Sequence, residues 1–376
     1  MNSIRHSVIP TFGKIVARDL LKGPRTTRAP EEHLQAALDW LTRAHDATED
    51  GGVSYGYSLR GGWKPSYIET SGYIATTFYN LAAGSKHGDG YAERAEQIVQ
   101  WLCEVQNADG SFSNPRFSSG GIVFDTGQDL FGLVRGYRET KDKRILASAE
   151  RAADWLVNVA DSEGRWTKSV HNGIPHVYNS RVAWALLQLH AESPTEDRER
   201  VARANLDWAV SQQKTNGWYE ECAFERGKAP FTHTIAYAIR GLLEAGLIAN
   251  DDSYIDSALR AAQSCISAMD SKGYIAGQID TQGQPAASYS CLTGTAQLAI
   301  VWAKLFERTG EPVYKDAAVR GLRYVMSCQD LKTHNVNVRG AIKGSHPTWG
   351  RYSPVTFPNW ATKFFIDAML LAEDWF

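Results

Sequence analysis

Six short polar clusters in the sequence each stand at the start of an apolar stretch with helical periodicity. They are Glu69-Thr-Ser, Asp125-Thr-Gly-Gln, Tyr178-Asn-Ser-Arg, Thr232-His-Thr, Thr293-Gly-Thr and Asn359-Trp-Ala-Thr. Helix capping explains many of these residues, because Ser, Thr, Asp and Asn side chains accept hydrogen bonds from the first N–H groups of a helix. Capping does not require Glu69, Arg181 or His233. These three residues therefore indicate a catalytic or binding role for the helix starts.

Two reactions fit the residues in these clusters. Glu69 and Asp125 head successive clusters and form a carboxyl pair, and such a pair hydrolyses a glycosidic bond when it stands on either side of that bond. Abstraction of the C5 proton of a uronate instead needs a base, an acid and a cation that neutralises the carboxylate. Return of the proton then gives an epimerase, and loss of the C4 substituent gives a lyase. The candidates for this second chemistry are Tyr178, Arg181, Tyr219, Glu221, His233 and Arg351.

The loops before the apolar stretches are long and rich in aromatic residues. Long irregular loops in a compact domain are usually functional or disordered, and the aromatic content argues against disorder. Aromatic rings present flat apolar faces to sugar rings, while arginine and histidine neutralise carboxylates. The loops and clusters together predict a site for an acidic poly- or oligosaccharide. The predicted substrate-binding residues are Tyr55, Trp63, Tyr73, Gln128, His176, Asn179, Trp218, Trp349, Arg351 and Tyr352.

Paired helices must position these clusters. In residues 124–156, Leu130, Leu133, Val134 and Tyr137 follow the i, i+3, i+4, i+7 spacing of an amphipathic helix. A polar turn and a second apolar stripe follow, so the unit is a helical hairpin whose stripes need neighbouring copies for burial. Six such hairpins predict an all-α (α/α)6 barrel of six inner and six outer helices. The alternative, an open solenoid, would need polar caps that the sequence lacks.

The repeats place the barrel, as the catalytic domain, in residues 31–376 and leave residues 1–30 as an N-terminal arm. The arm is mildly basic and lacks the apolar core and cleavage site of a signal peptide, so we predict a cytoplasmic protein. No apolar run is long enough to cross a membrane. The net charge of −2 argues against nucleic-acid binding. Five scattered cysteines predict neither a disulfide framework nor a zinc site, and we expect no cofactor and no metal; a homodimer is left open.

Two segments resemble known families. The hairpin of residues 124–156, and Trp218-Tyr-Glu-Glu followed by an apolar helix, resemble the C-terminal catalytic domain of glucuronyl C5-epimerases. Residues 65–73 resemble a motif of uncharacterised six-hairpin proteins found with bacterial exopolysaccharide biosynthesis. The resemblance implies an (α/α)6 barrel with uronate chemistry. The Glu-Tyr catalytic pair of the epimerases falls on Glu221 and Cys222, so Tyr219, Tyr178 or Tyr352 would have to supply the phenol.

These observations predict an enzyme that processes an acidic exopolysaccharide, or an oligosaccharide derived from it, by C5 proton abstraction as a lyase or C5-epimerase. A glycoside hydrolase that uses Glu69 and Asp125 as its acid and base is one alternative. The other is a glycan-binding scaffold without catalytic activity, which predicts aromatic residues at the site without convergent carboxylates.

Overall fold

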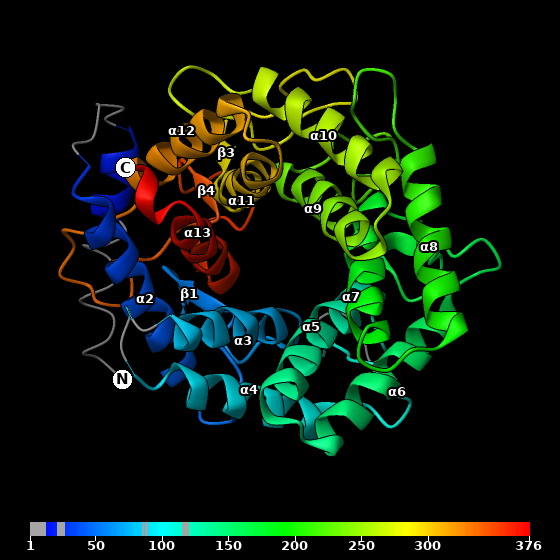
Figure 1. Ribbon diagram of the computed structural model, residues 1–376. Helices are drawn as coiled ribbons and strands as arrows, with labels where there is room; N and C mark the ends of the chain where they lie inside the picture. Colours follow the sequence, from blue (N-terminus) through cyan, green and yellow to red (C-terminus); the bar gives the residue numbers. More distant parts are fainter. Residues whose placement is uncertain (1–12, 21–26, 85, 87–88, 115–119) are drawn as a thin grey trace.

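The computed structural model describes residues 13–20, 27–84, 86, 89–114 and 120–376. Within these residues the chain forms two concentric sets of helices, which Figure 1 shows along the axis of the ring. The inner helices are α3 (Ile68–Ala83), α5 (Val123–Thr140), α7 (Ser180–His190), α9 (Thr232–Ala249), α11 (Leu292–Thr309) and α13 (Asn359–Leu371). The outer helices are α2 (Pro30–Asp46), α4 (Tyr91–Val105), α6 (Lys143–Val159), α8 (Glu196–Ser211), α10 (Asp252–Ser267) and α12 (Pro312–Cys328).

The inner helices form a closed ring. Each packs against the next in sequence order, and α13 packs back against α3. Each inner helix from α3 to α11 also packs against the outer helix that follows it, whereas α13 packs against α2. This closure confirms the predicted (α/α)6 barrel and excludes the open solenoid.

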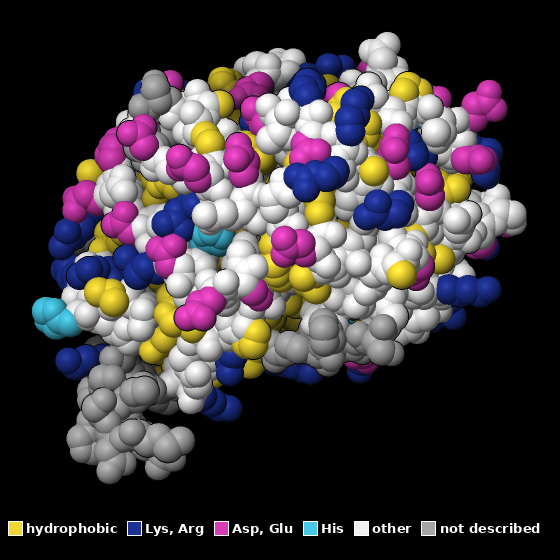
Figure 2. Space-filling view, turned by 90° about the horizontal axis from the view of Figure 1, so that it is seen from below, with side chains coloured by type: hydrophobic (Ala, Val, Ile, Leu, Met, Phe, Trp, Pro, Cys, Tyr) yellow, Lys and Arg dark blue, Asp and Glu magenta, His cyan; other side chains and the backbone are white. Residues whose placement is uncertain are grey.

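Burial explains why the two sets occupy different layers. Inner helices are apolar on nearly all sides and are buried along most of their length, as α9 and α11 illustrate. Outer helices bury one stripe and expose a charged face, as expected for amphipathic helices at a surface. In the space-filling view, Lys and Arg side chains are interspersed with Asp and Glu side chains, and no continuous basic stripe runs over that face (Figure 2). None of the described helices combines the length and the apolar character that crossing a membrane requires.

Short strands connect the loops at one end of the barrel. β1 (Gly56–Ser58) lies between β2 (Gly62–Trp63) and β5 (Thr356–Pro358) in an antiparallel sheet. β3 (Ser290–Cys291) pairs with β4 (Ser345–His346). The described residues also form 3-10 turns at His171–Gly173, Val177–Asn179 and Glu373–Trp375, and a further helical segment at residues 13–20. The β1–β5 pairing joins the loop before the first inner helix to the loop before the last, so it closes the ring at the loop level as well.

Glycine turns after the outer helices fix the hairpins. Gly110 has a left-handed φ of 90°, and a Cβ there would lie 2.4 Å from the carbonyl oxygen of Arg151. The aromatic residues that follow these turns pack inward, and Phe112 and Trp166 are fully buried. Each of these two turns therefore combines a left-handed glycine with a buried aromatic side chain.

We expect Gly110→Ala to destabilise the fold more than Gly310→Ala does. Both glycines have positive φ, so both variants bear the cost of roughly 1–2 kcal/mol for a left-handed L-residue. Only Gly110 also meets a backbone oxygen, because a Cβ at Gly310 would have no heavy atom within 4 Å. That clash adds roughly 1–3 kcal/mol to the loss in free energy of unfolding, which urea titration measures. Equal losses for the two variants would contradict this reading of the turn.

Candidate functional site

A cavity of about 630 Å³ opens at the end of the barrel where the inner helices begin. Its walls come from the first turns of α3, α5, α9 and α13 and from the loops that precede the inner helices. The lining residues are Tyr55, Tyr67, Glu69, Gly121, Ile122, Phe124, Asp125, Ser169, Val170, His171, Asn172, His176, Tyr178, Asn179, Phe224, His233, Thr234, Tyr237, Tyr352, Ser353 and Trp360.

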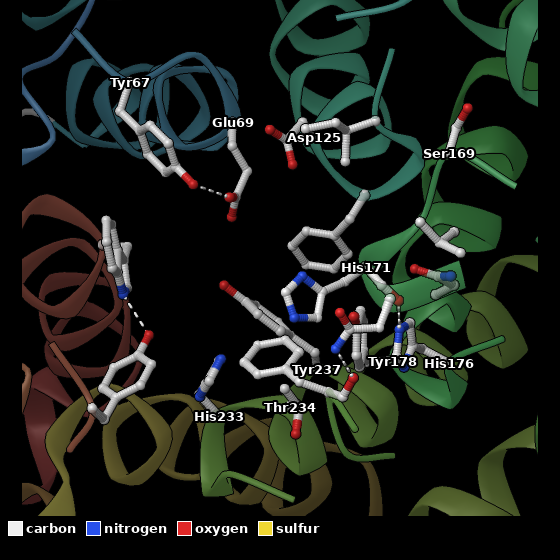
Figure 3. Close-up of a pocket in the computed structure, with 18 of the residues that line it drawn as sticks. Tyr67, Glu69, Asp125, Ser169, His171, His176, Tyr178, His233, Thr234 and Tyr237 are labelled. Atoms are coloured by element: carbon white, nitrogen blue, oxygen red, sulfur yellow. Dashed lines mark hydrogen bonds between the residues drawn. The ribbon is translucent and has the colours of Figure 1, made fainter. Parts of the chain in front are cut away.

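Glu69 and Asp125 face this cavity from neighbouring inner helices. Figure 3 shows both carboxyl groups directed into the same space, with Tyr67 on one side of them and Tyr178 on the other. Neither residue is the N-cap of its helix, because that position belongs to Tyr67 in α3 and to Ile122 in α5. The two carboxyls are therefore available for a ligand.

The environments of the two carboxyls differ. Burial raises the pKa of Glu69 to about 7, although the hydrogen bond from Tyr67 and the charge of Arg181 oppose this rise. The Tyr67 hydroxyl donates that bond to Glu69 Oε2 over 2.7 Å. Burial, and then the negative charge of Glu69, raise the pKa of Asp125 well above its ordinary value. Among the described residues, Asp125 Oδ2 has no hydrogen-bond partner. Burial thus disfavours ionisation of both carboxyls, and the charge of Glu69 disfavours it further at Asp125.

Aromatic rings surround the carboxyls. The His176 ring stacks on Tyr178 with ring centres 4.6 Å apart, and Phe124 meets the edge of Tyr178. On another part of the wall Trp360 Nε1 donates a hydrogen bond to the Tyr352 hydroxyl over 2.7 Å. Flat apolar rings with polar edges are suited to the faces and hydroxyl groups of sugars.

The histidines of the cavity are neutral at pH 7. Burial lowers the pKa of His233 to about 3 and that of His176 to about 4. In the described part of the chain His233 Nδ1 has no hydrogen-bond partner, and His176 Nε2 lies 2.9 Å from the His171 carbonyl oxygen. These rings can donate or accept hydrogen bonds, but they do not supply positive charge.

The structure brings together eight of the residues that the sequence predicts for the site. Among the described lining residues are Tyr55, Glu69, Asp125, His176, Tyr178, Asn179, His233 and Tyr352. The other predicted residues do not line this cavity. They are Trp63, Tyr73, Gln128, Arg181, Trp218, Tyr219, Glu221, Trp349 and Arg351.

Arg181 lies inside the barrel, where it is 2% exposed. Its guanidinium group is surrounded by aromatic rings, and its Nε donates to Gln128 Oε1 over 2.5 Å. Burial lowers the pKa of Arg181 to about 10, so it remains a cation at pH 7. Among the described residues, no carboxylate lies within ion-pair distance of Arg181, and Arg181 Nη1 has no hydrogen-bond partner. Arg181 does not line the cavity, but its positive charge lowers the pKa of Glu69 from within the protein.

The remaining predicted residues have other surroundings. Tyr219 and Trp218 are buried, and the Tyr219 hydroxyl lies 2.9 Å from Ser257 Oγ on α10. Trp63 donates to Asn337 Oδ1, and the buried Tyr73 lies one turn below Glu69 on α3. Trp349 is 45% exposed. Arg351 is exposed, and Glu221 forms a long ion pair with Arg226.

Sequence reasoning missed several lining residues, notably Tyr67, Phe124, His171, Phe224, Tyr237 and Trp360. Two of them carried a usable signal. Tyr237 follows His233 by four residues, so both must lie on the same helix face. Tyr67 immediately precedes the helix that carries Glu69. Phe224 and His171 come from two different loops that meet only in the folded chain.

No metal site is evident in the described part of the chain. It contains no group of three or more His, Cys, Asp or Glu side chains placed to hold an ion. The expectation that the site works without a metal or cofactor stays a prediction.

Comparison with known proteins gives matches at the level of structure. No family model matches the chain, and no curated protein matches it. The unsaturated glucuronyl hydrolase of Bacillus sp. GL1, described as responsible for glycosaminoglycan degradation, has a TM-score of 0.71 at 16% identity, over 92% of this chain and 97% of that one. A heparin-specific unsaturated glucuronyl hydrolase has a TM-score of 0.72 at 17% identity, with the same coverage. The unsaturated glucuronyl hydrolase of Streptococcus agalactiae has a TM-score of 0.66 at 14% identity, over 95% of this chain and 94% of that one.

At these identities the likeness establishes the fold. The chain has the (α/α)6 barrel fold of these hydrolases, as the sequence predicts. The more specific resemblance to glucuronyl C5-epimerases is not shown by these neighbours and stays a prediction.

Proposed function

We propose that this protein is a glycoside hydrolase that acts on a uronate-containing oligosaccharide. The observation that carries the proposal is the pairing of Glu69 and Asp125 in one aromatic-lined cavity, where burial raises the pKa of both carboxyls and the charge of Glu69 raises that of Asp125 further. Pairs of titratable groups whose environments separate their pKa values are characteristic of acid–base catalysis. The presence of convergent carboxyls also favours an enzyme over a glycan-binding scaffold.

We assign the protonated acid to Asp125, because both burial and the charge of Glu69 raise its pKa, and the carboxylate to Glu69. Neutral Asp125 donates its proton to the glycosidic oxygen as the bond from that oxygen to the anomeric carbon breaks. The anomeric centre gains positive charge, which the ionised Glu69 stabilises. Glu69 then accepts a proton from the attacking water, whose hydroxyl group bonds to the anomeric carbon. Tyr67 holds the Glu69 carboxylate by the hydrogen bond that it donates.

The charge of the cavity favours hydrolysis over C5 proton abstraction. Abstraction places negative charge on the uronate and needs a cation beside its carboxylate. None of the described lining residues is Lys or Arg, and the two arginines expected for this role, Arg181 and Arg351, do not line the cavity. Hydrolysis develops positive charge instead, which carboxyl groups stabilise. The lyase or epimerase reading, preferred on sequence, therefore has less support than the hydrolase reading.

The structural neighbours support the uronate as the sugar. One was solved as a variant together with dGlcA-Glc-Rha-Glc, and another as a variant in complex with dGlcA-GalNAc6S. Both names describe an acidic oligosaccharide that carries a dGlcA unit. We propose the same class of substrate for this chain, with the uronyl unit in the cavity beside Glu69 and Asp125.

The test is incubation of the protein with unsaturated and saturated glucuronyl disaccharides and with an acidic exopolysaccharide. Hydrolysis produces a new reducing end and adds one water to the mass of the products. Elimination would produce new ultraviolet absorbance from an unsaturated uronate, and epimerisation in heavy water would place deuterium at C5 without cleavage. Either of these results without hydrolysis would overturn the proposal.

Removal of the Tyr67 hydroxyl tests the environment of Glu69. The hydrogen bond from Tyr67 favours the ionised form of Glu69, so Tyr67→Phe should raise the pKa of Glu69. We expect the acidic limb of the pH–rate profile to move up by about one pH unit, since hydrogen bonds to charged groups contribute about 1.5–3 kcal/mol. The control is Tyr79→Phe on the same helix, which does not line the cavity and should leave the limb in place. An unchanged limb in Tyr67→Phe would contradict the assigned role of Glu69.

A further inference from the structure

The N-terminal segment, residues 13–20, is helical and lies against the long loop between α12 and α13. Asp19 is the centre of this contact, and its side chain is 1% exposed. Lys343 Nζ lies 2.6 Å from both carboxylate oxygens of Asp19, and the Thr348 backbone N–H donates to Oδ2 over 2.8 Å. His346 Nδ1 lies 3.6 Å from Oδ1. A single carboxylate therefore holds two points of the loop, Lys343 and Thr348.

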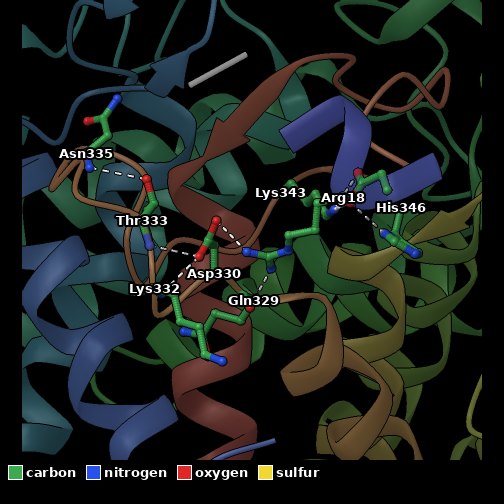
Figure 4. Close-up of polar contacts among 9 residues, drawn as sticks. Arg18, Gln329, Asp330, Lys332, Thr333, Asn335, Lys343 and His346 are labelled. Atoms are coloured by element: carbon green, nitrogen blue, oxygen red, sulfur yellow. Dashed lines mark hydrogen bonds and ion pairs between the residues drawn. The ribbon is translucent and has the colours of Figure 1, made fainter. Parts of the chain in front are cut away.

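The preceding residue holds the start of the same loop. Arg18 donates to the Gln329 carbonyl oxygen over 2.9 Å and forms an ion pair with Asp330 (Figure 4). Burial alone would raise the pKa of Asp19, but the charge and hydrogen bonds of Lys343 lower it below its ordinary value. Asp19 is thus ionised, and Lys343, 4% exposed on its side chain, is its counter-charge.

Buried ion pairs contribute little to net stability, because desolvation cancels much of their attraction. Their best-supported effect is to fix one arrangement of the chain among several. The arrangement fixed here is that of residues 343–348. These residues lie close in sequence to Tyr352 and Ser353, which line the cavity.

Two hydrogen bonds connect the held loop to the cavity wall. Ser345 Oγ donates to the Tyr352 carbonyl oxygen over 2.6 Å, and the Val355 N–H donates to the Thr348 carbonyl oxygen over 2.8 Å. Between these two bonds the chain forms a loop that presents Tyr352. The Tyr352 ring then packs on His233, with ring centres 4.4 Å apart.

We propose that Asp19 is a positioning residue of the cavity: through Lys343 and Thr348 it holds the loop that carries Tyr352 against His233. The role of Tyr352 as a sugar-binding wall rests on the proposed function. The position of the loop does not depend on that function. The N-terminal segment is therefore part of the binding site although none of its described residues lines the cavity.

Kinetics of Asp19→Asn test the effect on binding. With the unsaturated glucuronyl disaccharide as substrate, we expect KM to rise about tenfold, which corresponds to the loss of one well-placed aromatic contact. We expect kcat to stay within about threefold of the wild type, because Glu69 and Asp125 come from α3 and α5 and not from the loop that Asp19 holds. The matched control is Glu32→Gln, which breaks the exposed Arg28–Glu32 pair near the same end of the chain. It should leave both constants unchanged.

Hydrogen exchange tests the position of the loop without any substrate. In Asp19→Asn the amides of residues 343–355 should exchange faster, while those of α3 and α5 keep their protection. The double variant Asp19→Leu with Lys343→Met removes both charges and guards against a misfolded single variant, because one unpaired buried charge is more damaging than none.

The outcomes separate the two proposals. Faster exchange confined to residues 343–355 supports the positioning role even if no substrate is cleaved. Unchanged exchange in this segment, or faster exchange over the whole chain, overturns it. Local loosening with an unchanged KM would also overturn it, since Asp19 would then be structural only.

Discussion

Asp125→Asn should lower kcat by about 10²–10⁴-fold, the range that general acid catalysis contributes. The amide keeps the size of the side chain but cannot donate a proton to the glycosidic oxygen. The loss should be much smaller with a 4-nitrophenyl leaving group, because a weakly basic leaving group departs without protonation. Steady-state kinetics with the natural type of disaccharide and with the nitrophenyl glycoside measure this difference.

Asp129→Asn is the matched control for this variant. Asp129 lies one helical turn below Asp125 on α5, is fully buried and likewise has a raised pKa, caused first by burial and then by the charge of Asp125. It does not line the cavity. Its replacement should leave kcat within about threefold of the wild type, well below the loss expected for a general acid. If Asp129→Asn lost as much activity as Asp125→Asn, the assignment of Asp125 as the general acid would be wrong.

Glu69→Gln should also lower kcat by about 10²–10⁴-fold, but the loss should be equally large with both leaving groups. Glu69 acts on the water and on the charge at the anomeric carbon, and neither depends on the leaving group. A better leaving group that restored the Glu69→Gln variant and not Asp125→Asn would mean that the two roles are reversed.

The pH dependence follows from the same assignment. Glu69 must be ionised, so activity should fall as the pH drops through about 7, the value to which burial raises its pKa. Asp125 must be protonated, and its pKa is raised well above the ordinary value, so activity should also fall at higher pH. The apparent pKa values of the two limbs describe the Glu69–Asp125 pair and not either residue alone. An acidic limb near the ordinary pKa of 4.5 for Glu would contradict the burial of Glu69.

The sequence predicts the fold well because the barrel repeats one local pattern. Each hairpin shows its own helical periodicity, so errors in one repeat do not affect the others. The sequence also predicts that Glu69, Asp125 and His233 lie in the site, for a related reason. They lie in the first turn of inner helices, and a closed ring brings those turns to one end.

The errors of placement also have physical causes. Arg181 ends the cluster that Tyr178 begins, and its long side chain packs among aromatic rings inside the barrel. Neighbouring loop residues can face opposite ways, as Arg351 is exposed while Tyr352 lines the cavity. Nothing in a single sequence shows that residues 13–20 fold against the loop that precedes α13. Such contacts depend on distant segments, whereas helical periodicity is local.

Titration of the glutamate side chains by carbon NMR, in protein labelled at the glutamate carboxyl carbons, tests the acid–base pair most directly and needs no substrate. The account predicts one glutamate resonance with a pKa of about 7, absent from Glu69→Gln. If every glutamate carboxyl in the wild type titrated near the ordinary value of 4.5, Glu69 would not have the buried environment on which the proposed hydrolysis depends.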